Sequence, residues 1–501
     1  MTTGQIIGLV IVLLLTIFGG IMISKKSKSH TLLKWTGLFF LCAILLSWIF
    51  GAGYYQGGQL VAYGMIEQGL SDIPTLFEQV VDIAGDKLIF LLTLGIFYGI
   101  LSKNAGYKKL VLNIAKKMKG HEGTFVLSTS LILALMASIF NQTFGALVFV
   151  PFLISIILNM KLDKLTAFAG TFGGILVGVF GLLYGGEGAY WFNQYNNTTS
   201  STGITYRLFV FVVAFLVFGT FMILHIKKVL KSKKANELAS DPFLIEGVEK
   251  KAKVTPIVII LSIVFVLLVL GFVPWNALFK IEAFDKFHEW LFNLSLTGDG
   301  NVKVFRILLG TDASKVAFGR FNLFSISAVM LFFTCLVGMM SKMKFDEFLN
   351  YAIDGIKKIL KPATFIILGY AVLMVAYASP FVATISDGIF NGLKDITKFN
   401  PYLVSLMSMF ANIFHVDFGY TGFVLAPFFT TTYALHTEVI HTIFTTLFGF
   451  AGFFVPTQII LLIGLNYLNI DYKDWIKYIW KFLLIMFVVL LILFTFITYV
   501  F

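Results

Sequence analysis

Apolar runs of roughly 20 residues, each followed by a short polar segment, recur along the whole chain. Stretches such as Thr255–Phe272 and 482–500 are apolar almost all round, whereas the strands of a membrane β-barrel alternate apolar and polar residues. The pattern therefore predicts an all-α polytopic membrane protein with about ten transmembrane helices. We place these helices at residues 4–23, 35–54, 87–102, 165–184, 206–226, 254–272, 321–341, 362–378, 442–468 and 478–500.

Two further apolar segments, 124–160 and 401–435, are each long enough for one re-entrant hairpin or for two complete crossings. Lysines flank the first segment on both sides, within residues 103–119 and at Lys161 and Lys164. Because lysines gather on the cytoplasmic side of membrane proteins, we expect this segment to enter and leave on that side. A re-entrant hairpin meets this requirement, and two complete crossings would give the same topology.

Composition agrees with the membrane assignment. Of the 501 residues, 58% are hydrophobic and 13% are charged, and the mean hydropathy is +0.89, whereas soluble domains average about 45–50% apolar and about 25% charged residues. The sequence has no G-x-x-x-x-G-K-[ST] motif for nucleotide binding, no H-E-x-x-H motif and no cluster of Cys and His residues. We therefore expect no enzyme activity, no cofactor and no resident metal.

The net charge of +12 would suggest a nucleic-acid partner in a soluble protein. Here most of the 38 basic residues fall in segments expected to be cytoplasmic, so their distribution indicates membrane orientation instead, with the N-terminus outside. The many lysines, together with 56 phenylalanines, are typical of proteins from AT-rich bacterial genomes. We expect a multi-pass protein of the bacterial plasma (inner) membrane, with the lipid bilayer and no nucleic acid as a partner.

The two hairpin segments are similar to each other in sequence. Residues 137–145 (Ala-Ser-Ile-Phe-Asn-Gln-Thr-Phe-Gly) align without gaps to residues 411–419 (Ala-Asn-Ile-Phe-His-Val-Asp-Phe-Gly), with five identities in nine positions. The expected crossings divide into five before residue 227 and five after residue 253, and the two sets begin on opposite sides of the membrane. We therefore predict a 5+5 inverted repeat, with halves 1–226 and 254–501 joined by a basic cytoplasmic linker, 227–253.

Inverted halves of this kind are the architecture of alternating-access transporters, which bind their substrate where the halves meet. Hairpin tips within a membrane leave backbone groups without helical partners, so they must be buried in protein or face a wet cavity. The predicted substrate- or ion-binding residues of the first tip are Ser138, Asn141, Gln142, Thr143 and Gly145. Those of the second tip are Asn412, His415, Asp417, Gly419 and Thr421. The same two tips are the expected place for a Na⁺ ion.

Asp417 is the strongest of these candidates, because a carboxylate within a membrane is costly and usually marks the path of an ion or a proton. An internal ion pair is the structural alternative. For His415, a proton-linked or substrate-contacting role and a hydrogen-bonded structural role both stay open.

Two further candidate regions follow the hairpins. Pro456, Thr457 and Gln458 interrupt a predicted crossing, and the proline there removes a helical hydrogen bond and frees carbonyl groups for coordination. Glu187 follows the corresponding crossing of the first half, where it would line a vestibule or be a solvated loop charge.

Several short stretches carry a resemblance to a known family. They are residues 149–153 (Phe-Val-Pro-Phe-Leu), 161–166 (Lys-Leu-Asp-Lys-Leu-Thr), 206–211 (Tyr-Arg-Leu-Phe-Val-Phe), 345–348 (Phe-Asp-Glu-Phe), 354–358 (Asp-Gly-Ile-Lys-Lys), Lys361-Pro362, Pro456-Thr457 and 472–475 (Tyr-Lys-Asp-Trp). In order and spacing, the chain from about residue 87 to its end resembles the ion transporter superfamily. Within it, the chain is similar to the YfcC-like branch of the anaerobic C4-dicarboxylate carriers (DcuC-type). The resemblance implies a homodimeric secondary carrier for small carboxylated solutes or amino acids.

Together these observations predict a secondary active transporter that works by alternating access, either as an antiporter or by symport with H⁺ or Na⁺. Its expected solute is a small organic molecule, an amino acid or a carboxylate. Two alternatives stay open, an ion channel and a membrane sensor that binds a ligand without transporting it.

Overall fold

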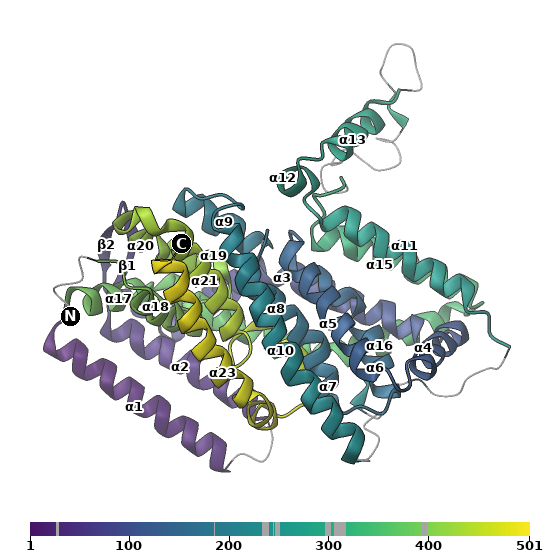
Figure 1. Ribbon diagram of the computed structural model, residues 1–501, viewed down its shortest axis with the longest axis horizontal. Coiled ribbons are helices and arrows are strands. Elements are labelled where there is room, and N and C mark those ends of the chain that lie inside the picture. The colour runs from purple at the N-terminus through teal and green to yellow at the C-terminus, as the bar shows by residue number, and fades with distance from the viewer. Residues whose placement is uncertain are drawn as a thin grey trace.

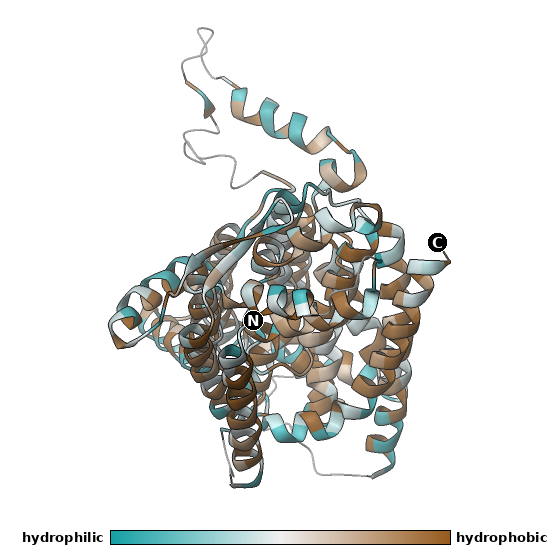
Figure 2. Cartoon of the chain, turned by 90° about the vertical axis from the view of Figure 1, so that its left-hand side faces the viewer, coloured by the Kyte–Doolittle hydropathy of each residue, from teal (hydrophilic) through white to brown (hydrophobic). Residues whose placement is uncertain are grey.

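The computed structural model describes residues 1–26, 30–184, 186–232, 240–243, 245, 251–295, 302–304, 317–392 and 398–500. Almost all of these residues are helical, and the sheet that they form is one two-stranded hairpin (Figure 1). The predicted all-α class is therefore confirmed. Figure 2 shows hydrophobic residues along the long helices, whereas hydrophilic residues gather near helix ends and on the helix that projects at the top.

Within the described residues, nine helices are long and apolar enough to cross a membrane. They are α1 (Thr3–Lys26), α2 (Thr31–Ile49), α5 (Glu122–Ile139), the continuous α7 (Lys164–Phe168) to α8 (Gly174–Gly181), α10 (Ile204–Ser232), α11 (Thr255–Phe272), α15 (Leu323–Met340), α16 (Phe345–Ala378) and α23 (Tyr472–Tyr499). A π-helical turn at Ala169–Gly173 joins α7 to α8.

Two predicted crossings correspond to elements outside this set. The first is α3 (Ile73–Leu101), which begins 14 residues earlier than expected and carries Asp82, Asp86 and Lys87 in its first half. The second is divided into two short helices, α21 (Thr437–Ala451) and α22 (Ile459–Tyr467), because residues 452–458 interrupt it around Pro456.

Two boundaries differ from the sequence prediction. The second helix ends at Ile49, and the chain continues as strands β1 (Ala52–Gln56) and β2 (Gln59–Gly64). Gly57 and Gly58 have φ angles of 57° and 79°, so they adopt the left-handed conformation that a tight two-residue hairpin turn requires. Helix α16 begins at Phe345 and not at residue 362, because Pro362 is accommodated inside one continuous helix.

Both hairpin segments reverse direction at a non-helical tip. In the first, α5 ends at Ile139 and the chain returns through a 3-10 turn (Thr143–Phe149) and α6 (Val150–Asn159). In the second, α18 (Pro401–Phe414) leads to α19 (Phe418–Val424) and α20 (Ala426–Thr432). Residues 140–142 form the tip of the first hairpin, and residues 415–417 form the tip of the second.

The remaining elements are short. Helix α9 (Gly186–Asn196) follows α8, and α4 (Ala105–Lys117) and α17 (Phe381–Gly392) precede the two hairpins. Helices α12 (Trp275–Phe279) and α13 (Ala283–Asn293) project from the bundle at the upper right of Figure 1. Single 3-10 turns lie at Leu70–Asp72 and Ala434–His436.

Glycines allow close contact between the helices where α3 meets α16. A methyl group at Gly355 would lie 2.0 Å from the carbonyl oxygen of Gly95, and one at Gly99 would lie 2.5 Å from that of Tyr351. Small residues of this kind let helices in membranes approach backbone to backbone, where dispersion contacts are strongest.

Helix contacts elsewhere include pairs that the predicted repeat would relate. Helix α5 packs on α8 and α18 packs on α21, and α8 and α21 pack on each other. At the last contact, a methyl group at Gly449 would lie 2.6 Å from the backbone nitrogen of Phe180. The inverted relation between the halves 1–226 and 254–501 stays a prediction.

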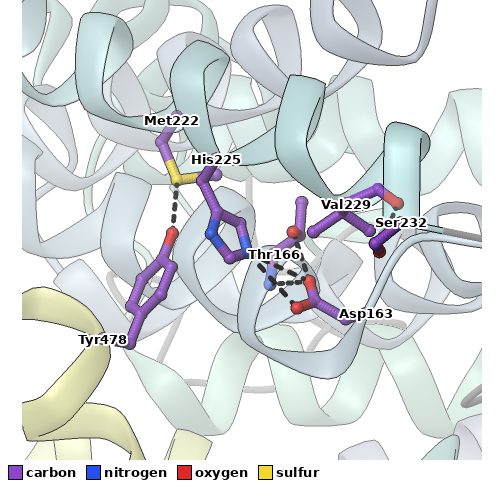
Figure 3. Close-up of polar contacts among 7 residues, drawn as sticks. All are labelled: Asp163, Thr166, Met222, His225, Val229, Ser232 and Tyr478. Atoms are coloured by element: carbon purple, nitrogen blue, oxygen red, sulfur yellow. Dashed lines mark hydrogen bonds and ion pairs between the residues drawn. The ribbon is translucent and has the colours of Figure 1, made fainter. Parts of the chain in front are cut away.

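A polar cluster ties three helices together near Asp163 (Figure 3). Asp163 caps the N-terminus of α7 by accepting a hydrogen bond from the Thr166 backbone N–H at 2.9 Å, and its Oδ2 lies 3.2 Å from Nε2 of His225 on α10. The ring of Tyr478 on α23 packs edge-on against His225, at 4.6 Å between centroids. Burial raises the pKa of Asp163, but the hydrogen bonds from His225 and Thr166 outweigh it and leave the pKa below its usual value.

The described part of the linker is anchored at the base of the first hairpin. Asp241 is buried and accepts hydrogen bonds from the Ser155 hydroxyl at 2.6 Å and from the Phe243 backbone N–H at 2.9 Å. Burial raises the pKa of Asp241 to about 6, although both hydrogen bonds and the charge of Lys358 oppose the rise. The Phe243 ring packs against Tyr98 and lies 5.0 Å below the Lys358 ammonium, so the linker contacts elements of both halves.

The contact between α3 and α16 gives a stability prediction. Gly355→Ala places a methyl group 2.0 Å from a backbone oxygen, so the two helices must separate, and we expect a loss of about 1–3 kcal/mol in the free energy of unfolding. The measurement is the melting temperature of the purified protein in detergent. Gly37→Ala is the control, because no atom lies within 4 Å of a methyl group there; equal melting temperatures for the two variants would contradict the account.

Candidate functional site

Both hairpin tips line one cavity of about 110 Å³, here called the inner cavity. Gln142 and Thr143 reach it from the first tip, Asp417 from the second tip, and Gln458 from the interruption between α21 and α22. Lys87 and Tyr370 line it from the central helices α3 and α16. Residues separated by more than 300 positions therefore share a single small space.

A second cavity of about 540 Å³, here called the outer cavity, shares Lys87 and Asp417 with the inner one. Its other charged lining residues are Asp82 and Asp86 on α3. Most of the remaining lining is aromatic and consists of Trp191, Tyr195, Phe324, Tyr377, Tyr420 and Phe423. Lys87 and Asp417 thus stand where the two cavities meet.

Asp417 is held at the start of α19. Its Oδ1 accepts a hydrogen bond from the Gly419 backbone N–H at 2.8 Å, so the carboxylate caps this helix. A methyl group at Gly188 of α9 would lie 3.0 Å from the same oxygen. Close packing of the α9 backbone therefore fixes the position of Asp417 from the other half of the chain.

Lys87 is a functional candidate that the sequence analysis did not select. Its side chain is only 10% exposed, and its Nζ donates a hydrogen bond to the Ile83 carbonyl and lies 3.0 Å from Asp86 Oδ1. The ammonium also faces the Tyr370 ring at 6.0 Å. The hydropathy pattern places Lys87 at the start of a predicted crossing, whereas the structure places it inside α3, where an ionisable residue is itself a signal of function.

The other predicted residues of the first tip hold the tip in place. Ser138 accepts a hydrogen bond from the Leu183 backbone N–H at 3.1 Å, and the Asn141 amide donates to the Phe321 carbonyl at 3.1 Å. Gly145 lies against Phe272, whose ring carbons would be 2.8 Å from an added methyl group. These three residues connect the tip to α8, α11 and α15 and do not line the inner cavity.

At the second tip, His415 and Thr421 are buried and lie 3.2 Å apart, from Nδ1 to the hydroxyl oxygen. Gly419 lines the outer cavity. The Asn412 side chain is fully buried, and neither its oxygen nor its nitrogen has a hydrogen-bond partner in the described chain. Because such groups are costly to bury alone, Asn412 is the described residue of this tip most in need of a water or an ion.

The interruption around Pro456 differs from expectation in one respect. The carbonyl groups expected to be free for coordination already accept hydrogen bonds: Pro456 from the Thr36 hydroxyl at 2.8 Å, Phe453 from the Trp475 indole at 2.7 Å, and Phe454 from Tyr472. Thr457 and Gln458 in turn donate to the Ile413 and Asn412 carbonyls of the second tip, at 2.8 and 2.9 Å. The interruption therefore supports the tip, and only Gln458 of this motif also lines the inner cavity.

The expected vestibule residue, Glu187, lies in the first turn of α9, and its side chain is outside the described part of the structure.

Comparison with known proteins places this chain in a family. Residues 7–500 match the family described as DcuC, C4-dicarboxylate anaerobic carriers. The chain belongs to this family. It is therefore a multi-pass membrane transporter for small organic solutes, and a bacterial plasma-membrane location is consistent with the family. The expected resemblance to anaerobic C4-dicarboxylate carriers is confirmed.

Two solved structures are distantly similar to this chain in fold. No curated protein matches the sequence. The fold is similar to that of Neisseria gonorrhoeae MtrF, from a class described as antimetabolite efflux pumps, with 12% identity, a TM-score of 0.43 and coverage of 95% of this chain and 96% of that one. It is also similar to the Alcanivorax borkumensis YdaH transporter, with 12% identity, a TM-score of 0.41 and coverage of 94% and 98%.

The contact between α9 and Asp417 gives a test of the site. In Gly188→Ala the new methyl group lies 3.0 Å from Asp417 Oδ1 and 3.2 Å from the Gly419 nitrogen, so the carboxylate must shift. We expect about tenfold slower transport, because small displacements of binding groups are costly, with the melting temperature little changed. The control is Gly123→Ala on α5, where a methyl group meets no atom within 4 Å. Transport at the control's rate would show that Asp417 is not positioned in this way.

Proposed function

We propose that the protein is a secondary active transporter that moves a small organic solute, an amino acid or a carboxylate, by alternating access. The observation that carries this proposal is the inner cavity, to which both hairpin tips contribute polar side chains. A site between two hairpin tips can be exposed to either side of the membrane by a small movement of one half against the other.

Residues along helix α3 give the order of the cavities on the proposed route of the solute. Asp82 and Asp86 line the outer cavity, Lys87 lines both cavities, and Leu91 and Leu94 line only a void of about 10 Å³ further along the helix. At 1.5 Å per residue, Asp82 and Leu94 are about 18 Å apart along the axis. Beyond Leu94 the helix continues toward Lys103, on the side that the lysine distribution predicts to be cytoplasmic.

The site is thus open through the outer cavity and closed toward the lysine-rich end by apolar packing. In the proposed cycle, the packing around Leu94, Pro151 and Tyr467 separates once the solute has entered, and the outer cavity closes. A carrier needs only one side open at a time, whereas a channel needs a continuous wet pore. This arrangement supports a carrier over the channel alternative.

The energy source for transport is part of the same proposal: an H⁺ gradient, a Na⁺ gradient or the exchange of one solute for another. Asp417 is an ionisable group beside the solute space, and the buried Asn412 amide lies one turn before the same tip. Coupling to H⁺ would use the carboxylate, and coupling to Na⁺ would use oxygen ligands of the tips. Exchange of one solute for another needs neither ion.

The test is solute counterflow into proteoliposomes that contain the full-length protein and are preloaded with single amino acids or dicarboxylates. We expect accumulation with a restricted set of solutes, and we expect Asp417→Asn to abolish it, because the amide removes the charge while keeping the side-chain shape. Asp474→Asn is the control, since Asp474 is exposed in the first turn of α23. Full transport by Asp417→Asn would refute the role of this carboxylate, and saturable binding without flux would favour a sensor.

A further inference from the structure

We infer that the transported solute is a zwitterion, an α-amino acid with a large side chain, whose ammonium group faces Asp417 and whose carboxylate faces Lys87. This inference rests on the proposed transport function and specifies the substrate class of the same site. It departs from the dicarboxylates that give the family its name.

The charges that line the outer cavity favour a zwitterion over a dianion. Asp82, Asp86 and Asp417 line the outer cavity together with a single described cation, Lys87, so three carboxylates face one ammonium. Cavities with low-dielectric walls focus the field of such charges, and a net negative vestibule repels anions and concentrates cations. A solute with two negative charges would have to pass this vestibule, whereas a zwitterion carries its own ammonium into it.

In the part of the chain that the structure describes, the inner cavity has one positive and one negative lining residue, which match the two charges of an α-amino acid. Lys87 and Asp417 are its charged lining residues among those described, one from each half of the chain. An α-amino acid presents an ammonium and a carboxylate on adjacent atoms, and charge-assisted hydrogen bonds to both are stronger than neutral ones. Gln142 and Thr143 of the first tip line the same space and supply neutral donors for the carboxylate.

The aromatic wall of the outer cavity favours a solute with a large side chain. Tyr195 packs between Trp191 and Phe423, with ring centroids 6.2 and 4.8 Å away, and Tyr377 packs edge-on against Tyr420 at 5.0 Å. Aromatic walls bind apolar and cationic side chains through their faces. With the α-carbon groups held at Lys87 and Asp417, a large side chain has this wall beside it.

The experiment uses phenylalanine, lysine and succinate as labelled probes for counterflow in proteoliposomes containing the intact protein. We expect exchange of phenylalanine or lysine and none of succinate. For the exchanged amino acid, the N-acetyl derivative lacks the ammonium and the primary amide lacks the carboxylate, so both should compete at least about tenfold less well. These competition measurements need no variant and do not depend on whether a substituted protein folds.

The Lys87→Gln variant then tests whether Lys87 binds the carboxylate of the solute. We expect the apparent KM for the amino acid to rise about tenfold, while competition by the amide derivative stays nearly the same, so that discrimination between the two disappears. Lys357→Gln is the control, because this lysine is exposed on α16 and forms an ion pair with Asp354 at 3.2 Å, away from both cavities. A structural role of Lys87 would weaken both ligands equally and would leave the discrimination intact.

The outcomes separate this inference from the proposed function. Exchange of succinate without exchange of either amino acid would overturn the zwitterion assignment and leave a carrier in place. If the N-acetyl derivative competed as well as the free amino acid, Asp417 would not be the partner of the ammonium group. The protein in this experiment must show an intact thermal transition. If it then exchanged none of the three probes and none of the amino acids and dicarboxylates of the wider panel, both the transport function and this inference would be contradicted.

Discussion

The structure depends on one constraint: backbone that leaves its helix inside an apolar solvent must find hydrogen-bond partners within the protein. Both hairpin tips satisfy it through hydrogen bonds with other elements. The Asn141 backbone N–H donates to the Phe272 carbonyl at the end of α11, and its side-chain amide donates to the Phe321 carbonyl just before α15. The second tip accepts hydrogen bonds from Thr457 and Gln458 of the interrupted crossing. The interruption is supported in turn by Thr36 and Trp475. These linked requirements bring two distant tips to one cavity.

The same solvent makes charge expensive, so the few ionisable groups of the interior are informative. Lys87 contacts Asp86 and the Ile83 carbonyl, and Asp417 caps a helix. Each charge is therefore stabilised by its own element before any solute arrives. Because these residues also hold their own elements together, conservative variants are more informative here than truncations.

The sequence predicted the fold class well, because long apolar runs have a single stable structure in a membrane. It also located both tips, because Phe-Gly follows polar residues in each. It missed Lys87, which stands at the boundary of an apolar run, and the β-hairpin at 52–64, whose signal is the Gly57-Gly58 turn. It could not separate residues that line the cavity, such as Gln142 and Thr143, from those that anchor the tip, such as Asn141, since only packing distinguishes them.

The central claim is that both tips form one solute site, and thiol protection tests it most directly. Single cysteines replace Phe144 and Val416, which line the inner cavity from the first and second tip, in a chain whose Cys42 and Cys335 are alanine. Each variant is labelled with a maleimide at increasing concentrations of a solute that the protein exchanges. The account predicts that this solute slows labelling at both positions with the same midpoint. Protection at one tip alone, or midpoints that differ widely, would contradict a shared site.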